Sequence, residues 1–456
     1  MDGDPGLVGL ARQVARLAWP VVFSGLASTM VLFTDRLMLG HYAADALGSM
    51  QVSGPLVWSL FSVFGAYAVG AMAVIGRAVG AGREADVRRT LVAVLLLAVA
   101  VGLAVGGIGF ALRADIAGLI VGTGPETADI RALAVTYLGI VLPFSAASLV
   151  GTAGVIALTA AGDTRTPMQI SVTAGLLNLA MSYVLIFGVY GAPELGIAGA
   201  ALGTAASMVV YMLLSLAALI RGSGPVKLVR RALPAGGPRA LLTPLGPVLR
   251  VAGPAFGEKI VFHAGYMAFV VLVGRLGEEA MAAHQALIAI ESLGFIATSA
   301  FGVAASALVA QRLGAGRPEE ASRAGWMAAG IAVAALCGVS LLFFAVPERL
   351  VGMFLDEPEV VALGAKCLLI AAVAQPLMAV TDALAGALRG AGDTRTPMAV
   401  ALAGPVMVRL AACWYLAFEL ELGLLGIWLG STLDWLVRAL WLTAVYARGR
   451  WMRISL

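Results

Sequence analysis

Five carboxylic acids lie inside strongly apolar stretches of this chain: Asp35, Glu258, Glu291, Asp382 and Asp434. An ionised carboxylate at the centre of a lipid bilayer costs about 2.5–3.5 kcal/mol, so each group needs a basic partner, a watery cavity or a proton. Burial favours the protonated acid, whereas a nearby cation favours the carboxylate. An acid balanced between these effects can take up a proton on one side of a membrane and release it on the other. These positions favour cation or proton binding.

Glu258 begins a row of aromatic residues. Phe262 and Tyr266 follow it at helical spacing and share its helix face. A carboxylate beside aromatic rings attracts an organic cation through charge and cation–π contacts. We therefore predict a substrate cavity lined by these three residues, with Glu291 and Asp382. The alternative is structural: Glu258 packs and pairs with a basic residue of a neighbouring helix, and Glu291 has a structural partner.

Two other groups of ionisable residues could likewise have either a functional or a structural role. His263 lies near the middle of the Glu258 helix and is a candidate proton relay; a packed neutral histidine is the alternative. Asp434 and Arg438 stand four residues apart, a spacing that lets them pair on one helix. We predict that they form a structural trio with Arg409.

The composition shows what kind of protein holds these ionisable groups. Of 456 residues, 61% are apolar and 12% are charged, whereas soluble domains carry about 25% charged residues. This excludes a soluble enzyme or a nucleic-acid-binding protein. The three cysteines lack metal spacing, so we expect neither a zinc site nor a disulfide framework. No nucleotide-binding Gly-Lys-Ser/Thr loop is present, so we do not expect the protein to use ATP directly.

A helix needs about 20 apolar residues to cross a bilayer. Continuous runs of this kind predict an all-α polytopic membrane protein with twelve transmembrane helices. The runs lie near 15–40, 51–76, 90–112, 132–156, 167–190, 196–220, 248–274, 284–310, 325–346, 360–387, 397–418 and 423–446.

The basic residues predict the orientation of these helices. With both termini in the cytoplasm, most of the 30 Lys and Arg residues fall in cytoplasmic segments, while four lie on the opposite side: Arg113, Arg131, Arg275 and Arg349. This bias follows the positive-inside rule. The net charge of +4 therefore reflects topology, and we expect a multi-pass membrane protein with both termini in the cytoplasm.

The chain also repeats itself. The sequence Gly162–Met168 recurs letter for letter at Gly392–Met398, and Gly80–Arg83 recurs at Gly314–Arg317. Because each repeat holds six helices, the copies have the same orientation and are related by a pseudo-twofold axis along the membrane normal. We predict an N-lobe at 1–220, a basic linker at 221–247 and a C-lobe at 248–456. The Gly-Asp-Thr-Arg-Thr-Pro copies read as turns closed by an aspartate, with a cytoplasmic gate as the alternative.

These motifs also carry a family resemblance. The chain resembles the MATE (multidrug and toxin extrusion) transporters, of the bacterial NorM and DinF type, along essentially its whole length. The matching stretches are Phe33–Gly40, Asn178, Pro193–Ala201, Ala282–Gln285, Ile290–Leu293 and both copies of the two repeated motifs. The resemblance implies a bilobed twelve-helix antiporter of the bacterial inner membrane that exports organic, often cationic, compounds against an inward flow of protons or sodium ions.

The resemblance also implies a cation-coupling site. It makes Asp35 the ion-binding carboxylate of the N-lobe and places Asn178, Ser182 and Thr204 beside it. Asn178 and Ser182 are four residues apart and share one helix face. Archaeal DinF-type relatives have a second acid where this chain has Ser182, which argues against a paired-carboxylate mechanism. Sodium-coupled NorM-type relatives carry acids on helices 7 and 10, but Glu258 and Asp382 do not occupy the same turns, so that site is not transferred.

The prediction is thus a multidrug efflux antiporter, coupled to protons rather than sodium, with no cofactor beyond the coupling ion. We expect amphipathic cationic substrates, a lipid bilayer as surroundings, no nucleic-acid partner and a monomer. The main alternative is a flippase for lipid-linked precursors or polysaccharides, which intramembrane basic residues such as Lys259 and Arg409 would suit. A membrane-embedded enzyme would need clustered His, Asp or Ser groups at one depth, whereas the three His residues are scattered.

Overall fold

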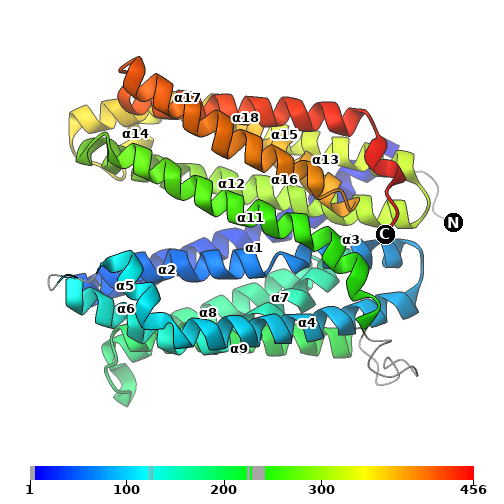
Figure 1. The fold of residues 1–456 in the computed structure, drawn as a ribbon, viewed down its shortest axis with the longest axis horizontal. Coiled ribbons are helices and arrows are strands. Elements are labelled where there is room, and N and C mark those ends of the chain that lie inside the picture. Colours follow the sequence, from blue (N-terminus) through cyan, green and yellow to red (C-terminus); the bar gives the residue numbers. More distant parts are fainter. Residues whose placement is uncertain (1–5, 123, 125–126, 223–225, 228–241) are drawn as a thin grey trace. The chain divides into compact units, whose positions relative to one another are not determined.

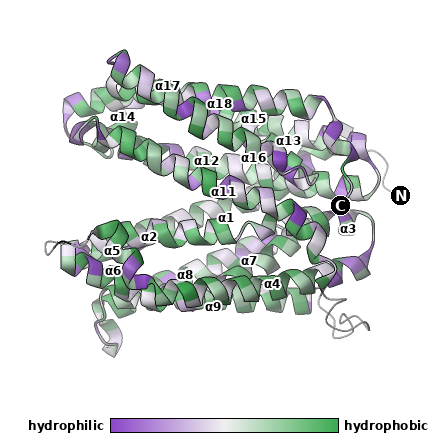
Figure 2. Ribbon diagram, in the orientation of Figure 1, coloured by the Kyte–Doolittle hydropathy of each residue, from purple (hydrophilic) through white to green (hydrophobic). Residues whose placement is uncertain are grey.

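The structure is a computed structural model that describes residues 6–122, 124, 127–222, 226–227 and 242–456. Every regular element among these residues is a helix (Figure 1). Helices are expected here because a bilayer offers no water to backbone N–H and C=O groups, which must then pair within each span. Figure 2 shows the hydrophilic residues concentrated at loops and helix ends. The predicted linker at 221–247 lies mostly outside the described residues.

The helices of the first half begin near the N-terminus and follow one another through short connections. They are α1 Gly6–Tyr42, α2 Ala44–Phe64, α3 Tyr67–Gly80, α4 Glu84–Ala111, α5 Arg113–Val121, α6 Ala128–Val141, η2 Leu142–Phe144, α7 Ser145–Ala160, α8 Arg165–Phe187, η3 Val189–Gly191 and α9 Ile197–Arg221.

The second half repeats this succession. Its helices are α11 Leu245–Gly274, α12 Glu278–Gly314, α13 Pro318–Ala345, α14 Pro347–Val351, α15 Pro358–Gly390, α16 Arg395–Ala401, η5 Leu402–Arg409, α17 Leu410–Trp414, η6 Tyr415–Glu419, α18 Gly423–Ala447 and η7 Arg450–Arg453.

The helices bear out the predicted all-α membrane fold. Among the described residues, ten are long and apolar enough to span a bilayer, and eleven if the bent pair α2 and α3 counts as one span. The remaining predicted run coincides with α18, which has 25 residues but carries Asp434 and Arg438 in its interior.

Two spans are less regular than the sequence predicts. A bend of 41° separates α2 from α3, where a Cβ on Gly65 would lie 2.5 Å from the Phe61 carbonyl oxygen. The run predicted at 397–418 contains two π-helical stretches, η5 and η6, and Pro405 lies within η5. Proline removes a backbone donor and clashes with the preceding turn, which accounts for the wider turn around it.

Contacts divide the chain into two compact units. Unit 1 consists of Met1–Val22, Met72–Gly82 and Arg250–Leu456, and unit 2 consists of Phe23–Ala71 and Arg83–Leu249. The start of α1 and most of α3 thus pack with the second half of the chain. The division into lobes at 220 and 248, which follows the sequence repeat, stays a prediction.

The two Gly-Asp-Thr-Arg-Thr-Pro copies form the predicted turns. Asp163 Oδ1 accepts hydrogen bonds from the backbone N–H of Arg165 at 3.1 Å and of Thr166 at 3.0 Å. Asp393 Oδ1 accepts one from the N–H of Thr396 at 3.1 Å. Each aspartate therefore satisfies at least one backbone N–H at a helix start, as the predicted turn requires.

Candidate functional site

Asp35 is buried inside unit 2, with 5% of its surface exposed. It lies on α1, about two turns before this helix ends at Tyr42. Leu39, one turn further along the same face, is fully buried. The face of α1 that carries Asp35 therefore packs into the unit.

Asn178 of α8 connects Asp35 to α9. With its amide nitrogen facing Asp35, Asn178 donates a hydrogen bond to Asp35 Oδ2 at 3.0 Å, and its amide oxygen accepts one from the backbone N–H of Thr204 at 3.1 Å. The opposite orientation places the amide nitrogen 3.3 Å from Thr204 Oγ1. The first orientation satisfies both ends of the amide and is the one that the hydrogen-bond network assigns.

Ser182 lies one helical turn from Asn178 and is fully buried. Its hydroxyl is beside the Asp35 carboxylate, yet it makes no hydrogen bond of standard geometry among the described residues. A buried hydroxyl oxygen without such a bond is available to a further ligand.

Small residues allow α9 to approach this site closely. A Cβ on Gly203 would lie 2.5 Å from Ser182 Oγ, and a Cβ on Gly199 would lie 2.5 Å from the Leu185 carbonyl oxygen. Such distances leave no room for a side chain, so glycine at both positions holds Thr204 against α8.

Tyr137 of α6 is a site residue that the sequence analysis missed. It is 3% exposed, within hydrogen-bonding reach of Thr204 and close to the charge of Asp35. The available signal was the residue type, because the hydroxyl of a tyrosine inside an apolar span needs a polar partner.

No basic side chain forms an ion pair with Asp35 in the part of the chain that the structure describes. The neighbouring Arg36 lies about 100° round the helix and is partly exposed. The site is thus one carboxylate surrounded by an amide and three hydroxyl groups, from four helices. Such a donor set can hold a proton or a small monovalent cation.

In unit 1, Glu258 of α11 forms an ion pair with Arg389, near the end of α15. Arg389 Nε also lies 3.4 Å from Glu258 Oε2, and Lys259 is electrostatically close to both. The ion pair expected under the structural alternative is therefore present. A role for Glu258 in substrate binding stays a prediction.

The other two acids predicted to line a cavity also have polar neighbours in unit 1. Asp382 Oδ2 accepts a hydrogen bond from Thr298 Oγ1 at 2.6 Å. Glu291 is 5% exposed, and Gln375 Nε2 lies 3.4 Å from Glu291 Oε1. The structure places the two acids in separate hydrogen-bonded pairs.

The aromatic residues of α11 are accessible. Phe262 is 38% exposed and Tyr266 is 39% exposed. His263 contacts Phe262 edge-on, with 5.4 Å between the ring centroids, and lies one turn from Lys259. Their roles in substrate binding and proton relay stay predictions.

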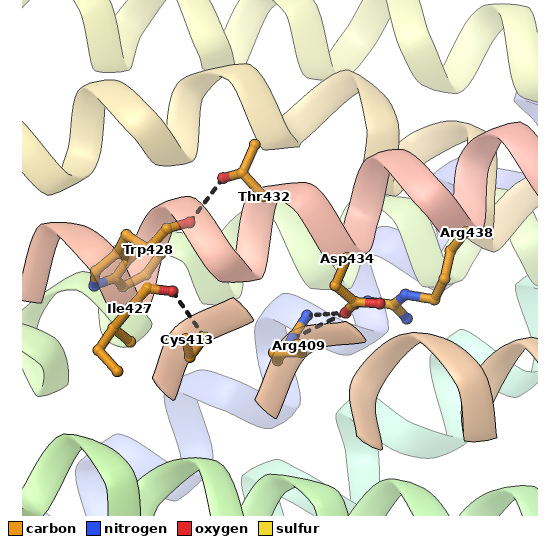
Figure 3. Close-up of polar contacts among 7 residues, drawn as sticks. All are labelled: Arg409, Cys413, Ile427, Trp428, Thr432, Asp434 and Arg438. Atoms are coloured by element: carbon orange, nitrogen blue, oxygen red, sulfur yellow. Dashed lines mark hydrogen bonds and ion pairs between the residues drawn. The ribbon is translucent and has the colours of Figure 1, made fainter. Parts of the chain in front are cut away.

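The predicted trio around Asp434 is confirmed (Figure 3). Asp434 is fully buried, and its Oδ2 accepts hydrogen bonds from Arg409 Nε at 2.9 Å and Arg438 Nη2 at 2.8 Å. The Arg438 guanidinium also lies 3.6 Å from the centroid of the Trp435 ring. These contacts hold α18 to η5 and reduce the positive charge that a buried polyanion site would need.

The described residues contain no group of three or more His, Cys, Asp or Glu side chains that could hold a metal ion. The three cysteines are free.

Comparison with known proteins gives one family. The sequence profile of the MatE family matches residues 20–184 and again residues 254–415. A probable multidrug resistance protein NorM of Pseudomonas aeruginosa is 32% identical over 450 residues, which cover 94% of this chain and 87% of that protein. A probable multidrug resistance protein NorM of Thermotoga maritima is 28% identical over 454 residues, which cover 97% of this chain and 93% of that protein.

Solved structures agree on the fold. The chain superimposes on the Vibrio cholerae MATE transporter VcmN with a TM-score of 0.88 at 17% sequence identity, covering 98% of each chain. The double match of the family profile falls on the two halves that the repeated motifs define.

Proposed function

Because the chain belongs to the MATE family of transporters, we propose that it is a proton-coupled antiporter that exports amphipathic organic cations. Its relatives are named multidrug resistance proteins, and they match this chain over nearly its full length. Export by exchange for an entering ion fits a protein that has no nucleotide-binding loop in its sequence.

The observation that carries the proposal is the environment of Asp35. A buried carboxylate without a counter-charge must lose its charge or gain a cation. Asn178 donates a hydrogen bond to it, and the neighbouring hydroxyl groups of Ser182, Thr204 and Tyr137 are polar but carry no positive charge. Protonation neutralises the group without any further ligand, which favours a proton over sodium as the coupling ion.

Alternating access turns this binding into transport. A proton from outside neutralises Asp35, and its release to the cytoplasm restores the charge. Exchange of one proton for one monovalent cation moves no net charge, so the proton concentration gradient supplies the energy, about 1.4 kcal/mol or a tenfold gradient of substrate per pH unit. The positive-inside pattern supports a protein of the bacterial inner membrane with both termini in the cytoplasm, which we take to be a monomer.

The substrate surface that we propose is the accessible aromatic face of α11, with Phe262 and Tyr266 as the contact residues. Aromatic rings attract organic cations of many shapes, so they suit a transporter of several drugs. We propose that Glu258, which pairs with Arg389, and the buried acids Glu291 and Asp382 complete the substrate-binding region of unit 1. The flippase alternative is less well supported, because Arg409 and Arg438 already share Asp434.

The test is transport of a fluorescent organic cation into everted membrane vesicles, with imposed proton or sodium gradients. We expect proton-driven uptake in the wild type and its loss in Asp35→Asn. Asp45→Asn is the matched control, because this exposed aspartate lies at the start of α2. Sodium-driven uptake would overturn proton coupling, and normal transport by Asp35→Asn would overturn the site.

A further inference from the structure

Three aromatic rings meet at the end of unit 2 where α1 stops. They belong to Tyr42 of α1 and to Tyr183 and Phe187 of α8. The centroids of Tyr42 and Phe187 are 6.4 Å apart with the rings inclined by 69°, and those of Tyr183 and Phe187 are 5.5 Å apart at 57°. Tyr42 is 38% and Tyr183 48% exposed, so these inclined rings are accessible.

A carboxylate borders the three rings. Glu194, in the loop between α8 and α9, is exposed, and its carboxylate lies within hydrogen-bonding reach of the Tyr42 hydroxyl. An exposed carboxylate next to several aromatic faces is the arrangement that recognises an organic cation. We call Tyr42, Tyr183, Phe187 and Glu194 the aromatic cage.

The loop that carries Glu194 is held in a special conformation. Tyr190 has a φ of 58°, which is rare for a residue with a side chain. Gly188 and Gly196 also have positive φ angles, and a Cβ on them would lie 2.9 Å from Glu194 Cβ and 2.6 Å from the Tyr42 ring, respectively. Glycine at both positions therefore allows Glu194 and Tyr42 to meet.

The second half of the chain provides a natural comparison. Glu421-Leu422-Gly423 repeats Glu194-Leu195-Gly196, and the glycine that ends each tripeptide has a φ of 54°. A Cβ on Gly423 would meet nothing within 4 Å, whereas one on Gly196 would meet Tyr42. The positive φ of this glycine thus occurs without a tyrosine contact. The two loops differ at the glutamate, since Glu421 itself has a φ of 54°.

The cage lies in line with Asp35. Tyr42 follows Asp35 by seven residues, which puts both on one face of α1, about 10 Å apart along the helix axis. The helix that carries the proposed coupling carboxylate therefore ends at the aromatic cage, whose rings and carboxylate suit a cationic substrate.

We propose that the aromatic cage is a low-affinity binding site for amphipathic organic cations at this end of unit 2. The inference rests on the proposed function, in whose topology this end of unit 2 faces the outside. The aromatic cage would then bind substrate as it leaves the transporter. Affinity is low because each exposed cation–π contact contributes only about two- to fivefold.

The test uses a cysteine label inside the loop. Ala192→Cys is introduced with Cys337→Ser, which removes the exposed native thiol, and the rate of maleimide labelling is measured on the purified full-length protein. We expect saturating tetraphenylphosphonium to slow labelling several-fold, because the bound cation would cover part of the loop. Tetraphenylborate, which has the same shape and the opposite charge, should leave the rate unchanged.

Variants identify the residues responsible. We expect Glu194→Gln and Tyr42→Ala to abolish the protection, while Tyr42→Phe, which keeps the ring, retains part of it. Glu421→Gln is the matched carboxylate control, and Tyr190→Asn removes an aromatic ring from the same loop outside the cage; both should keep full protection.

Three results would overturn the proposal: no protection in the parent protein, protection that survives in Glu194→Gln and Tyr42→Ala, or equal protection by tetraphenylborate. Loss of gradient-driven transport with intact protection would instead contradict the proposed function, so the two failures are distinguishable. Correct folding is checked by a single symmetric peak in size-exclusion chromatography.

Discussion

Gly80 of α3 packs directly on the backbone of Gln311 of α12: a Cβ on Gly80 would lie 1.8 Å from the Gln311 carbonyl oxygen. The contact is reciprocal, since a Cβ on Gly314 would lie 2.1 Å from the Arg77 carbonyl oxygen. Gly80 and Gly314 are the first residues of the two Gly-Ala-Gly-Arg copies. This repeated motif therefore marks a close helix crossing within unit 1.

Adding a methyl group at this crossing should destabilise the protein. Gly80→Ala and Gly314→Ala force backbone against backbone, and overpacking typically costs about 1–3 kcal/mol. We expect a clearly lower thermal midpoint in detergent for each. Gly330→Ala is the control, because its Cβ would meet nothing within 4 Å and alanine favours a helix. Equal midpoints for Gly80→Ala and Gly330→Ala would contradict the crossing.

The trio around Asp434 gives a second prediction. Asp434→Asn leaves Arg409 and Arg438 buried without their shared counter-charge, and breaking a buried pair costs about 3–5 kcal/mol. We expect little folded protein from this variant, and partial recovery when Arg438→Gln is added. A fully stable Asp434→Asn would show that water or another acid already neutralises the arginines.

Ser182 and Asn178 should respond differently to truncation. Ser182→Ala removes a hydroxyl that makes no standard hydrogen bond among the described residues, so stability should hold while ion-coupled transport falls several-fold. Asn178→Ala removes the bridge between Asp35 and Thr204 and should lower both. Thermal unfolding and vesicle transport, measured on the same preparations, check this. Unchanged transport in Ser182→Ala would exclude Ser182 from the ion site.

The C-terminal segment is predicted to stabilise unit 1. Trp451 is 2% exposed and stacks on Tyr446 with 4.6 Å between ring centroids, and Arg77 Nη1 donates to the Ile454 carbonyl at 2.7 Å. Trp451→Ala should therefore cost about 3–5 kcal/mol. Trp414→Ala, at a residue that is 47% exposed, should lower the thermal midpoint much less; the reverse order would contradict the packing.

Much of the fold followed from hydropathy and charge, because a span in lipid must be a continuous apolar helix. The bend between α2 and α3 and the π-helical turns of η5 did not. They depend on local contacts, such as that of Gly65 with the Phe61 carbonyl, and leave the apolar pattern unchanged. The packing of Met72–Gly82 with the second half likewise depends on the glycine crossing, whose partners are distant in sequence.

The candidate site was partly predictable. Family positions led to Asp35, Asn178, Ser182 and Thr204, and the structure brings these four together. Tyr137 was missed because a single tyrosine in an apolar run has no periodic signal.

Local spacing identified Asp434 and Arg438, which share one helix. It did not identify Arg389 as the partner of Glu258, because the two are 131 residues apart on different helices. Pairing within a helix is encoded in spacing, whereas pairing between distant helices is decided by packing.

The central claim is that Asp35 exchanges a proton for substrate, and proton release tests it most directly. When tetraphenylphosphonium is added to purified protein in weakly buffered solution, linkage predicts release of about one proton per molecule. We expect this release in the wild type and in Asp45→Asn, and none in Asp35→Asn. Binding without proton release in the wild type, or full release from Asp35→Asn, would contradict the account.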